Sequence, residues 1–83
     1  MSSVKIRPPK LDLKVIGRRI REMRGFDLTQ AQFAEMLGIR QNTLSNYEIG
    51  KIVPTLEMLL KLKAHSGKSI DWIVTGEETL SHR

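Results

Sequence analysis

Apolar residues recur at the three- and four-residue steps of an amphipathic helix in five separate segments of the chain. Capping residues and glycines between these segments give the expected helix bounds, which are 13–24, 30–37, 41–48, 56–64 and 70–74. The first segment shows the pattern clearly, with an apolar stripe made of Leu13, Ile16, Ile20 and Met23. The pattern predicts an all-α fold of short helices around a small core.

The stretch from residue 28 to residue 48 contains two of these helices, separated by a tight break at Gly38. The two apolar stripes consist of Phe33, Ala34 and Leu37, and then of Leu44 and Tyr47. A helix, a short turn with a glycine and a second helix form the helix-turn-helix signature. The second helix carries polar side chains off its stripe, namely Gln41, Asn42, Thr43 and Asn46. An amide can pair bidentately with the N6/N7 edge of adenine, so this chemistry suits the DNA major groove.

The residues of this stretch and its flanks resemble the Cro/CI-type helix-turn-helix family, the phage-repressor-like DNA-binding domains also called XRE-like. The resemblance covers residues 16–76. It rests on Leu28-Thr29-Gln30, Phe33-Ala34, Leu37-Gly38-Ile39, Thr43-Leu44-Ser45, Tyr47-Glu48, Gly50-Lys51, Pro54 and the block 70–76. The family resemblance implies a compact five-helix bundle of the phage-repressor DNA-binding domain type, with the helix-turn-helix formed by helices 2 and 3. Arg40 departs from the family, which usually has Ser or Thr there to cap the recognition helix.

The resemblance also implies which residues contact DNA. Gln41, Asn42, Thr43 and Asn46 match or adjoin the positions that contact bases. The backbone-contacting candidates are Gln30, Arg40, Lys51, Arg19 and Tyr47, although core packing is the alternative for Tyr47. The family usually gives the glutamate at Glu48 an intramolecular ion pair, for which Arg19 and Arg24 are the two candidate partners.

Charge is distributed unevenly along the chain, whose formal net charge is +5. Residues 1–24 carry eight basic and two acidic side chains, whereas the remaining residues carry six and seven. A positive field concentrated at one end favours a polyanion such as nucleic acid. The same charges are also compatible with an ordinary solvated helix face.

The chain divides into three regions by composition. Residues 1–11 contain two prolines and three cations, which predicts a flexible basic arm that lies on DNA or is a disordered tail. Residues 12–76 form the predicted domain, and residues 77–83 a short C-terminal tail. In the fourth helix, Leu56, Leu59, Leu60 and Leu62 are expected to fill the core, which leaves Met58 towards a partner. Trp72 and Ile73 are expected to belong to the core and seal the bundle. The surface left around Trp72, Ile73 and Val74 is a candidate for pairing with a second copy.

Several kinds of site lack the residues that they require. The chain has no cysteine, and a nearby carboxylate set for His65 is missing, so neither a disulfide framework nor a metal site is expected. The chain has neither a nucleophile–base set nor a Gly-rich phosphate loop, the features that would indicate an enzyme. No apolar run is long enough for a signal peptide or a membrane helix. We therefore expect no cofactor, small-molecule ligand or membrane contact, and a cytoplasmic protein encoded by a prokaryote or a phage.

The function implied by the resemblance is sequence-specific binding of double-stranded DNA as a transcriptional regulator. The expected form is a repressor that binds an inverted-repeat operator as a homodimer. Its recognition helices would enter successive major grooves about 34 Å apart. The alternative is a protein-interaction module or an antitoxin-like component that uses the same fold.

Overall fold

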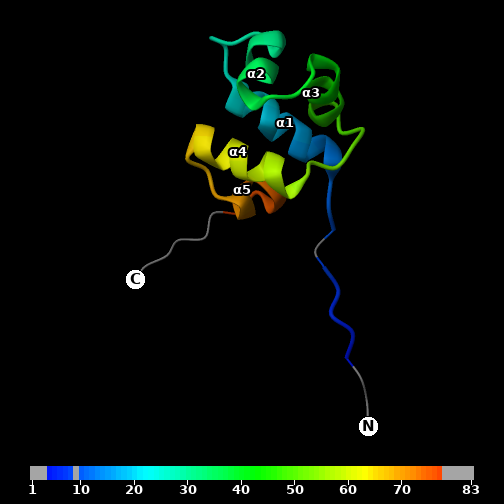
Figure 1. The fold of residues 1–83 in the computed structure, drawn as a ribbon. Coiled ribbons are helices and arrows are strands. Elements are labelled where there is room, and N and C mark those ends of the chain that lie inside the picture. The colour runs from blue at the N-terminus through cyan, green and yellow to red at the C-terminus, as the bar shows by residue number, and fades with distance from the viewer. Residues whose placement is uncertain (1–3, 9, 78–83) are drawn as a thin grey trace.

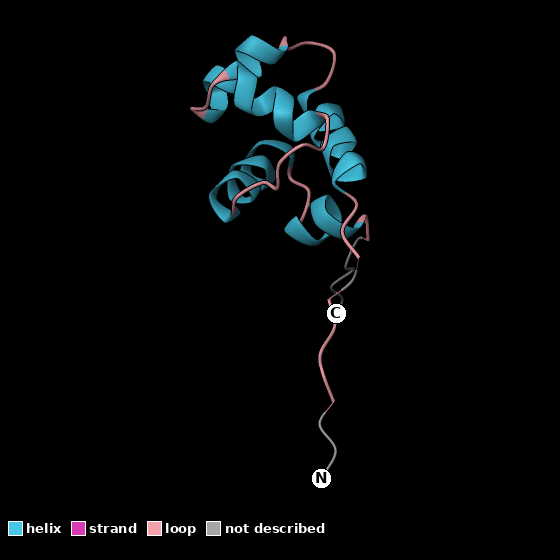
Figure 2. Ribbon diagram, turned by 90° about the vertical axis from the view of Figure 1, so that its right-hand side faces the viewer, coloured by secondary structure: helices cyan, strands magenta, loops and turns pink. Residues whose placement is uncertain are grey.

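The structure is a computed structural model that describes residues 4–8 and 10–77 of the chain. Within these residues the chain forms α-helices and no strand (Figures 1 and 2). The helices are α1 (Leu13–Arg24), α2 (Gln30–Leu37), α3 (Gln41–Glu48), α4 (Leu56–Ser66) and α5 (Ile70–Thr75). The predicted all-α fold and the order of its five helices are confirmed. Most of the predicted C-terminal tail, from residue 78 onward, lies outside the described residues.

Side-chain caps explain why α1, α2, α4 and α5 begin where the sequence predicts. The carboxylate of Asp12 accepts from the backbone N–H groups of Lys14 and Val15 at 3.1 and 3.3 Å. Thr29 and Gln32 form a reciprocal capping box at the start of α2. Thr55 and Ser69 accept from the third residue of α4 and α5, respectively. Each oxygen satisfies an N–H group that has no partner inside its helix.

The core lies between α1 and the four other helices. In Figure 1, α1 crosses the middle of the bundle, with α2 and α3 on one side and α4 and α5 on the other. The buried apolar residues come from every helix: Ile16, Ile20, Phe33, Ala34, Leu37, Leu44, Tyr47, Met58, Leu62 and Ile73. Burial of these side chains is the main contribution to the stability of the folded state.

α4 presents a different face to the core from the one predicted. Met58 and Leu62, four residues apart, are buried, whereas Leu56 and Leu60 are exposed and Leu59 is half-buried. The predictions that Leu56 and Leu60 fill the core and that Met58 faces a partner are therefore wrong. α4 also continues through Ser66 rather than ending at residue 64, because the left-handed residue that stops it is Gly67.

Gly17 brings α1 and α3 into direct backbone contact. A Cβ atom at this position would lie 2.5 Å from the carbonyl oxygen of Tyr47 and would also collide with that of Glu48. Only a residue without a side chain allows this approach. The C-terminal end of α3 is therefore fixed against the first half of α1.

The N-terminal arm leaves the bundle beside the loop between α3 and α4. The described part, residues 4–8 and 10–11, is exposed and contains no helix or strand. It runs away from the helices in both ribbon views (Figures 1 and 2). Gly50 fixes the point of departure, because a Cβ atom there would meet the backbone of Leu13 and Lys14 at 2.7–2.8 Å.

Candidate nucleic-acid interface

Gln30, the first residue of α2, joins both ends of α3. Its Nε2 atom donates to Oε1 of Glu48 at 3.1 Å, near the C-terminal end of α3. Its Oε1 atom accepts from Nε2 of Gln41 at 3.4 Å, at the N-terminal end of α3. The predicted backbone-contacting Gln30 and the predicted base-contacting Gln41 therefore lie side by side.

Glu48 is the acceptor at the centre of this network. Arg24 donates to both carboxylate oxygens, from Nε at 2.9 Å and from Nη2 at 3.1 Å. The two side chains are only 16% and 5% exposed, and Arg24 also donates to the carbonyl oxygen of Leu28 at 3.2 Å. Of the two partners left open by the sequence, Arg24 is the one that pairs with Glu48. The ion pair links α1, α3 and the α1–α2 loop around Gln30.

The exposed face of α3, which we call the amide face, carries the predicted base-contacting residues Gln41, Asn42, Thr43 and Asn46. Gln41 and Asn42 are exposed, while Thr43 and Asn46 are half-buried. Asn42 and Asn46 make no side-chain hydrogen bond to any other residue that the structure describes. Their amide groups can therefore meet an external partner without first breaking a bond inside the protein.

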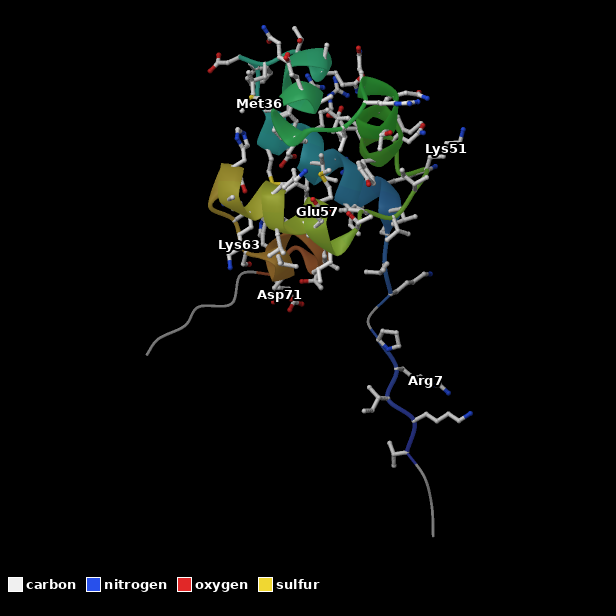
Figure 3. The ribbon with its side chains drawn as sticks, viewed as in Figure 1. Arg7, Met36, Lys51, Glu57, Lys63 and Asp71 are labelled. Carbon is white, nitrogen blue, oxygen red and sulfur yellow. The ribbon has the colours of Figure 1, made fainter. Side chains whose placement is uncertain are left out.

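Arg40 and Lys51 lie at the two ends of α3. Arg40 occupies the N-cap position with an extended backbone, and its side chain makes no capping hydrogen bond. Lys51 is exposed, and its backbone N–H donates to the carbonyl oxygen of Asn46 at 2.8 Å. In Figure 3 the Lys51 side chain points away from the bundle at the outer edge of the α3–α4 loop. Two cations thus lie at opposite ends of the amide face.

Arg19 and Tyr47 lie apart from the other predicted DNA-contacting residues. The guanidinium of Arg19 donates from Nη1 to the carbonyl oxygen of Ile73 at 3.1 Å, at the end of α5, and packs beside Gly76. Tyr47 is 6% exposed and belongs to the core. The structure brings neither side chain to the amide face, and for Tyr47 it matches the core-packing alternative.

Lys61 supports the helix-turn-helix, a role that could not be predicted from the sequence. Its Nζ atom donates to the carbonyl oxygen of Leu37 at 2.7 Å and thereby holds the end of α2 beside the turn. From the sequence alone, a lysine on a helix is normally interpreted as a solvated charge. The helix spacing alone could not show that α4 carries this residue to the turn.

Other kinds of chemistry find little support in the described part of the chain. No group of three or more His, Cys, Asp or Glu side chains is placed to hold a metal ion there. The His65 ring packs at a tilt on Phe33, with 4.9 Å between centroids, and its Nε2 lies 3.3 Å from the carbonyl oxygen of Met23. None of the helices is long and apolar enough to cross a membrane.

Comparison with known proteins matches residues 18–73 to the family model described as helix-turn-helix. The chain is 33% identical over 66 residues to the HTH-type transcriptional activator BcrR of Enterococcus faecalis, an alignment that covers 78% of this chain and 32% of BcrR. It is 36% identical over 63 residues to an uncharacterized, SPbeta prophage-derived HTH-type transcriptional regulator, YonR of Bacillus subtilis, which covers 75% and 58% of the two chains. The chain thus spans about a third of one relative and somewhat over half of the other.

The fold is shared with solved structures, among them the two that follow. The P22 c2 repressor in complex with a synthetic operator superposes with a TM-score of 0.69 at 30% identity, covering 76% of this chain and 97% of the repressor chain. The restriction-modification controller protein C.AhdI from Aeromonas hydrophila superposes with a TM-score of 0.64 at 27% identity, covering 75% and 91%. The phage-repressor architecture predicted from the sequence is confirmed by these likenesses.

Proposed function

The chain belongs to the helix-turn-helix family, and from this membership and its exposed amide face we propose that it is a sequence-specific DNA-binding transcriptional regulator. In this proposal it acts as a repressor that binds an inverted-repeat operator as a homodimer. It does so in the cytoplasm and has no enzymatic activity. The observation that carries the proposal is the placement of Gln41. It lies exposed at the start of α3 and is held by Gln30, which is in turn anchored on Glu48.

The amide face and the residues that flank it have distinct roles in this proposal. Gln41 and Asn42, with Thr43 and Asn46 behind them, contact base edges in the major groove. Gln30, Arg40 and Lys51 contact the sugar–phosphate backbone, where cations supply affinity and fix the register without reading sequence. The similarity to a repressor solved with an operator supports this arrangement. Arg19 is left out because its guanidinium is engaged at the end of α5.

Selection of bound sequences from a random duplex pool tests the proposal directly. An enriched inverted repeat is the expected outcome, with an affinity that falls steeply as salt rises because phosphate contacts release counterions. Binding without enrichment would mean that α3 does not read bases. An absence of binding even at low salt would favour the protein-interaction alternative.

Base-reading and backbone residues should separate by mutation. Gln41→Ala and Asn42→Ala should each reduce discrimination between the operator and single-base variants by about 1–3 kcal/mol, because a bidentate amide pair is lost. Lys51→Ala should weaken binding to all these duplexes by the same factor, because it removes only a phosphate contact. Fluorescence anisotropy with the operator and its variants measures both effects. If base preference survives both amide substitutions, other residues read the operator.

The exposed apolar side chains of Ile52, Val53, Leu56 and Leu60 form the surface that we assign to the dimer. They are between 37% and 68% exposed and run from the loop after Lys51 into α4. Leu56 and Leu60 share one face of α4, four residues apart. Ile73 is completely buried, as predicted for a core residue, and Trp72 is half-buried beneath the ammonium of Lys68, so the other candidate surface, around Trp72–Val74, offers less exposed apolar area. Two copies that meet beside Lys51 would face the same side of the DNA.

Replacing both leucines with Leu56→Glu and Leu60→Glu should make the protein monomeric in analytical ultracentrifugation. Its affinity for the full inverted repeat should fall by about a hundredfold, because the second protomer no longer arrives linked to the first. Affinity for an isolated half-site should remain that of the wild type. Met36→Glu is the matched control, since Met36 is similarly exposed on α2 and should not affect association. Unchanged association of the double variant would place the dimer surface elsewhere.

A further inference from the structure

The arginines of α1 fall into two groups by their contacts. Arg19 donates to the carbonyl oxygen of Ile73, and Arg24 is held by Glu48. Arg18 and Arg21 are exposed, and neither makes a hydrogen bond or an ion pair with another residue that the structure describes. Arg18 and Arg21 are three positions apart and therefore lie on one side of α1. Two guanidinium groups are thus available to an external anion.

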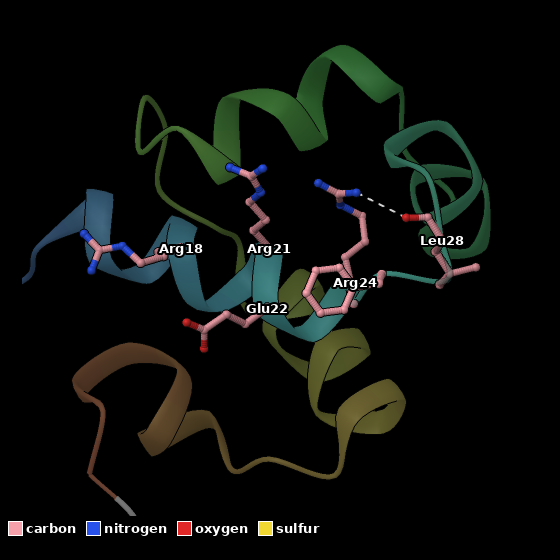
Figure 4. Close-up of a pocket in the computed structure, with 7 residues that line it drawn as sticks. Arg18, Arg21, Glu22, Arg24 and Leu28 are labelled. Atoms are coloured by element: carbon pink, nitrogen blue, oxygen red, sulfur yellow. Dashed lines mark hydrogen bonds between the residues drawn. The ribbon is translucent and has the colours of Figure 1, made fainter.

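These two arginines line an open depression of about 640 Å³ beside the α1–α2 loop. Figure 4 shows that Arg21 and Arg24 point from α1 towards α3, whereas the carboxylate of Glu22 points to the opposite side. The charge of Arg24 is already balanced by Glu48. Arg18 and Arg21 therefore leave the depression positively charged despite Glu22, and a phosphate group complements that charge.

Phe26 adds a large apolar surface to the same depression. It is the residue after Gly25 in the α1–α2 loop, and its side chain is fully exposed. The core cluster does not include Phe26, so the ring contributes nothing to the packing of the bundle. A single exposed apolar residue is ordinary, but an exposed aromatic ring beside two available guanidinium groups matches the mixed character of the sugar–phosphate backbone.

The depression also adjoins the interface assigned to operator binding. Arg24 lies in its wall and is bonded to Glu48, which accepts from Gln30. Gln30 begins α2, four residues after Phe26. A DNA strand that passes the N-terminal end of α2 can therefore continue onto this part of α1 and its loop.

We infer that Arg18, Arg21 and Phe26 form an outer-flank surface that binds the sugar–phosphate backbone of DNA beyond the base pairs read by α3. Arg18 and Arg21 bind phosphates, and the Phe26 ring covers deoxyribose. The inference rests on the proposed function, because the flank is defined by the operator. It makes affinity depend on duplex length outside the inverted repeat, while base preference stays with α3.

Two duplexes that contain the same inverted repeat test the inference. One ends at the edge of the repeat, and the other extends by one helical turn, about ten base pairs, on each side. The wild-type protein should bind the longer duplex about tenfold more tightly in fluorescence anisotropy at low salt. Arg18→Gln and Arg21→Gln should each reduce this difference to about threefold, and the double variant should remove most of it. For a dimer, each single variant should also reduce the slope of log K against log salt by about 2 on the longer duplex, since each phosphate contact contributes about 0.9.

The control variants separate a flank contact from a general loss of charge. Lys63→Gln removes one exposed cation from α4, on the side of the bundle away from α3 in Figure 3, and should leave the length dependence intact. Phe26→Ser should weaken binding to the longer duplex without changing its salt slope. Equal wild-type affinity for the two duplexes would overturn the inference, as would equal losses on both duplexes for the arginine variants. A wild-type protein that does not prefer the inverted repeat would overturn the proposed function as well.

Discussion

Replacing Gly17 with alanine is expected to lower the free energy of unfolding by about 3 kcal/mol. The new methyl group would collide with the carbonyl oxygens of Tyr47 and Glu48. These are backbone atoms at the end of α3, so no side-chain rotation can relieve the collision. Alanine gains about 1 kcal/mol of helix propensity over glycine, which is too little to offset the separation of α1 and α3. Urea unfolding followed by circular dichroism measures the difference.

Gly67→Ala provides the control for this substitution. Gly67 has φ +78°, and a Cβ atom there would have nothing within 4 Å. The substitution therefore introduces left-handed strain without a steric collision and should cost about 1 kcal/mol. A Gly17→Ala variant as stable as the wild type would show that α1 and α3 do not approach as closely as described.

Replacing Glu48 with glutamine should affect both stability and DNA binding. The guanidinium of Arg24 would remain largely buried without a counter-charge, and removal of one partner from such a pair costs about 3 kcal/mol. Gln30 would be held less firmly, because the amide that replaces the carboxylate has only one acceptor oxygen. Arg24 and Gln30 would then compete for that oxygen. Thermal unfolding and operator binding should both be measured, and both should fall.

Glu57→Gln is the matched control, because it breaks another glutamate ion pair. Glu57 lies 3.6 Å from Lys61 and its side chain is 80% exposed, so the loss should be less than about 0.5 kcal/mol. A double variant, Arg24→Met with Glu48→Leu, should recover much of the stability, because apolar residues can replace a buried pair. It should not recover operator affinity, because Gln30 has lost its acceptor. Recovery of both properties would show that Glu48 acts on the fold alone.

The helix bounds could be predicted because local chemistry determines them. Asp12, Thr29 and Ser69 each accept from the first turn of the helix that follows, and this pairing needs only neighbouring residues. The recognition face of α3 is equally local, because its polar residues lie off the stripe of Leu44 and Tyr47. Whether these polar residues contact bases stays a prediction.

The contacts between helices could not be predicted in the same way. In α4, apolar residues at 56, 58, 59, 60 and 62 occupy several faces, so periodicity could not select Met58 and Leu62 as the buried pair. Arg19 and Arg24 carry the same group on the same helix, and only the packing of α5 and α3 decides that Arg24 meets Glu48. Gly17 offered a signal, since a glycine inside a helix usually has a packing reason.

Of the five helices in the described part of the chain, α3 alone begins without a side-chain cap, at Arg40. The N–H groups of its first turn therefore receive no acceptor from the side chain that precedes the helix. Under the proposed function, acceptor atoms of the DNA can take the place that Asp12, Thr29, Thr55 and Ser69 take in the other helices. The operator DNA would then cap α3, the helix that contacts its bases. The stability of the first turn of α3 would be thermodynamically linked to operator occupancy.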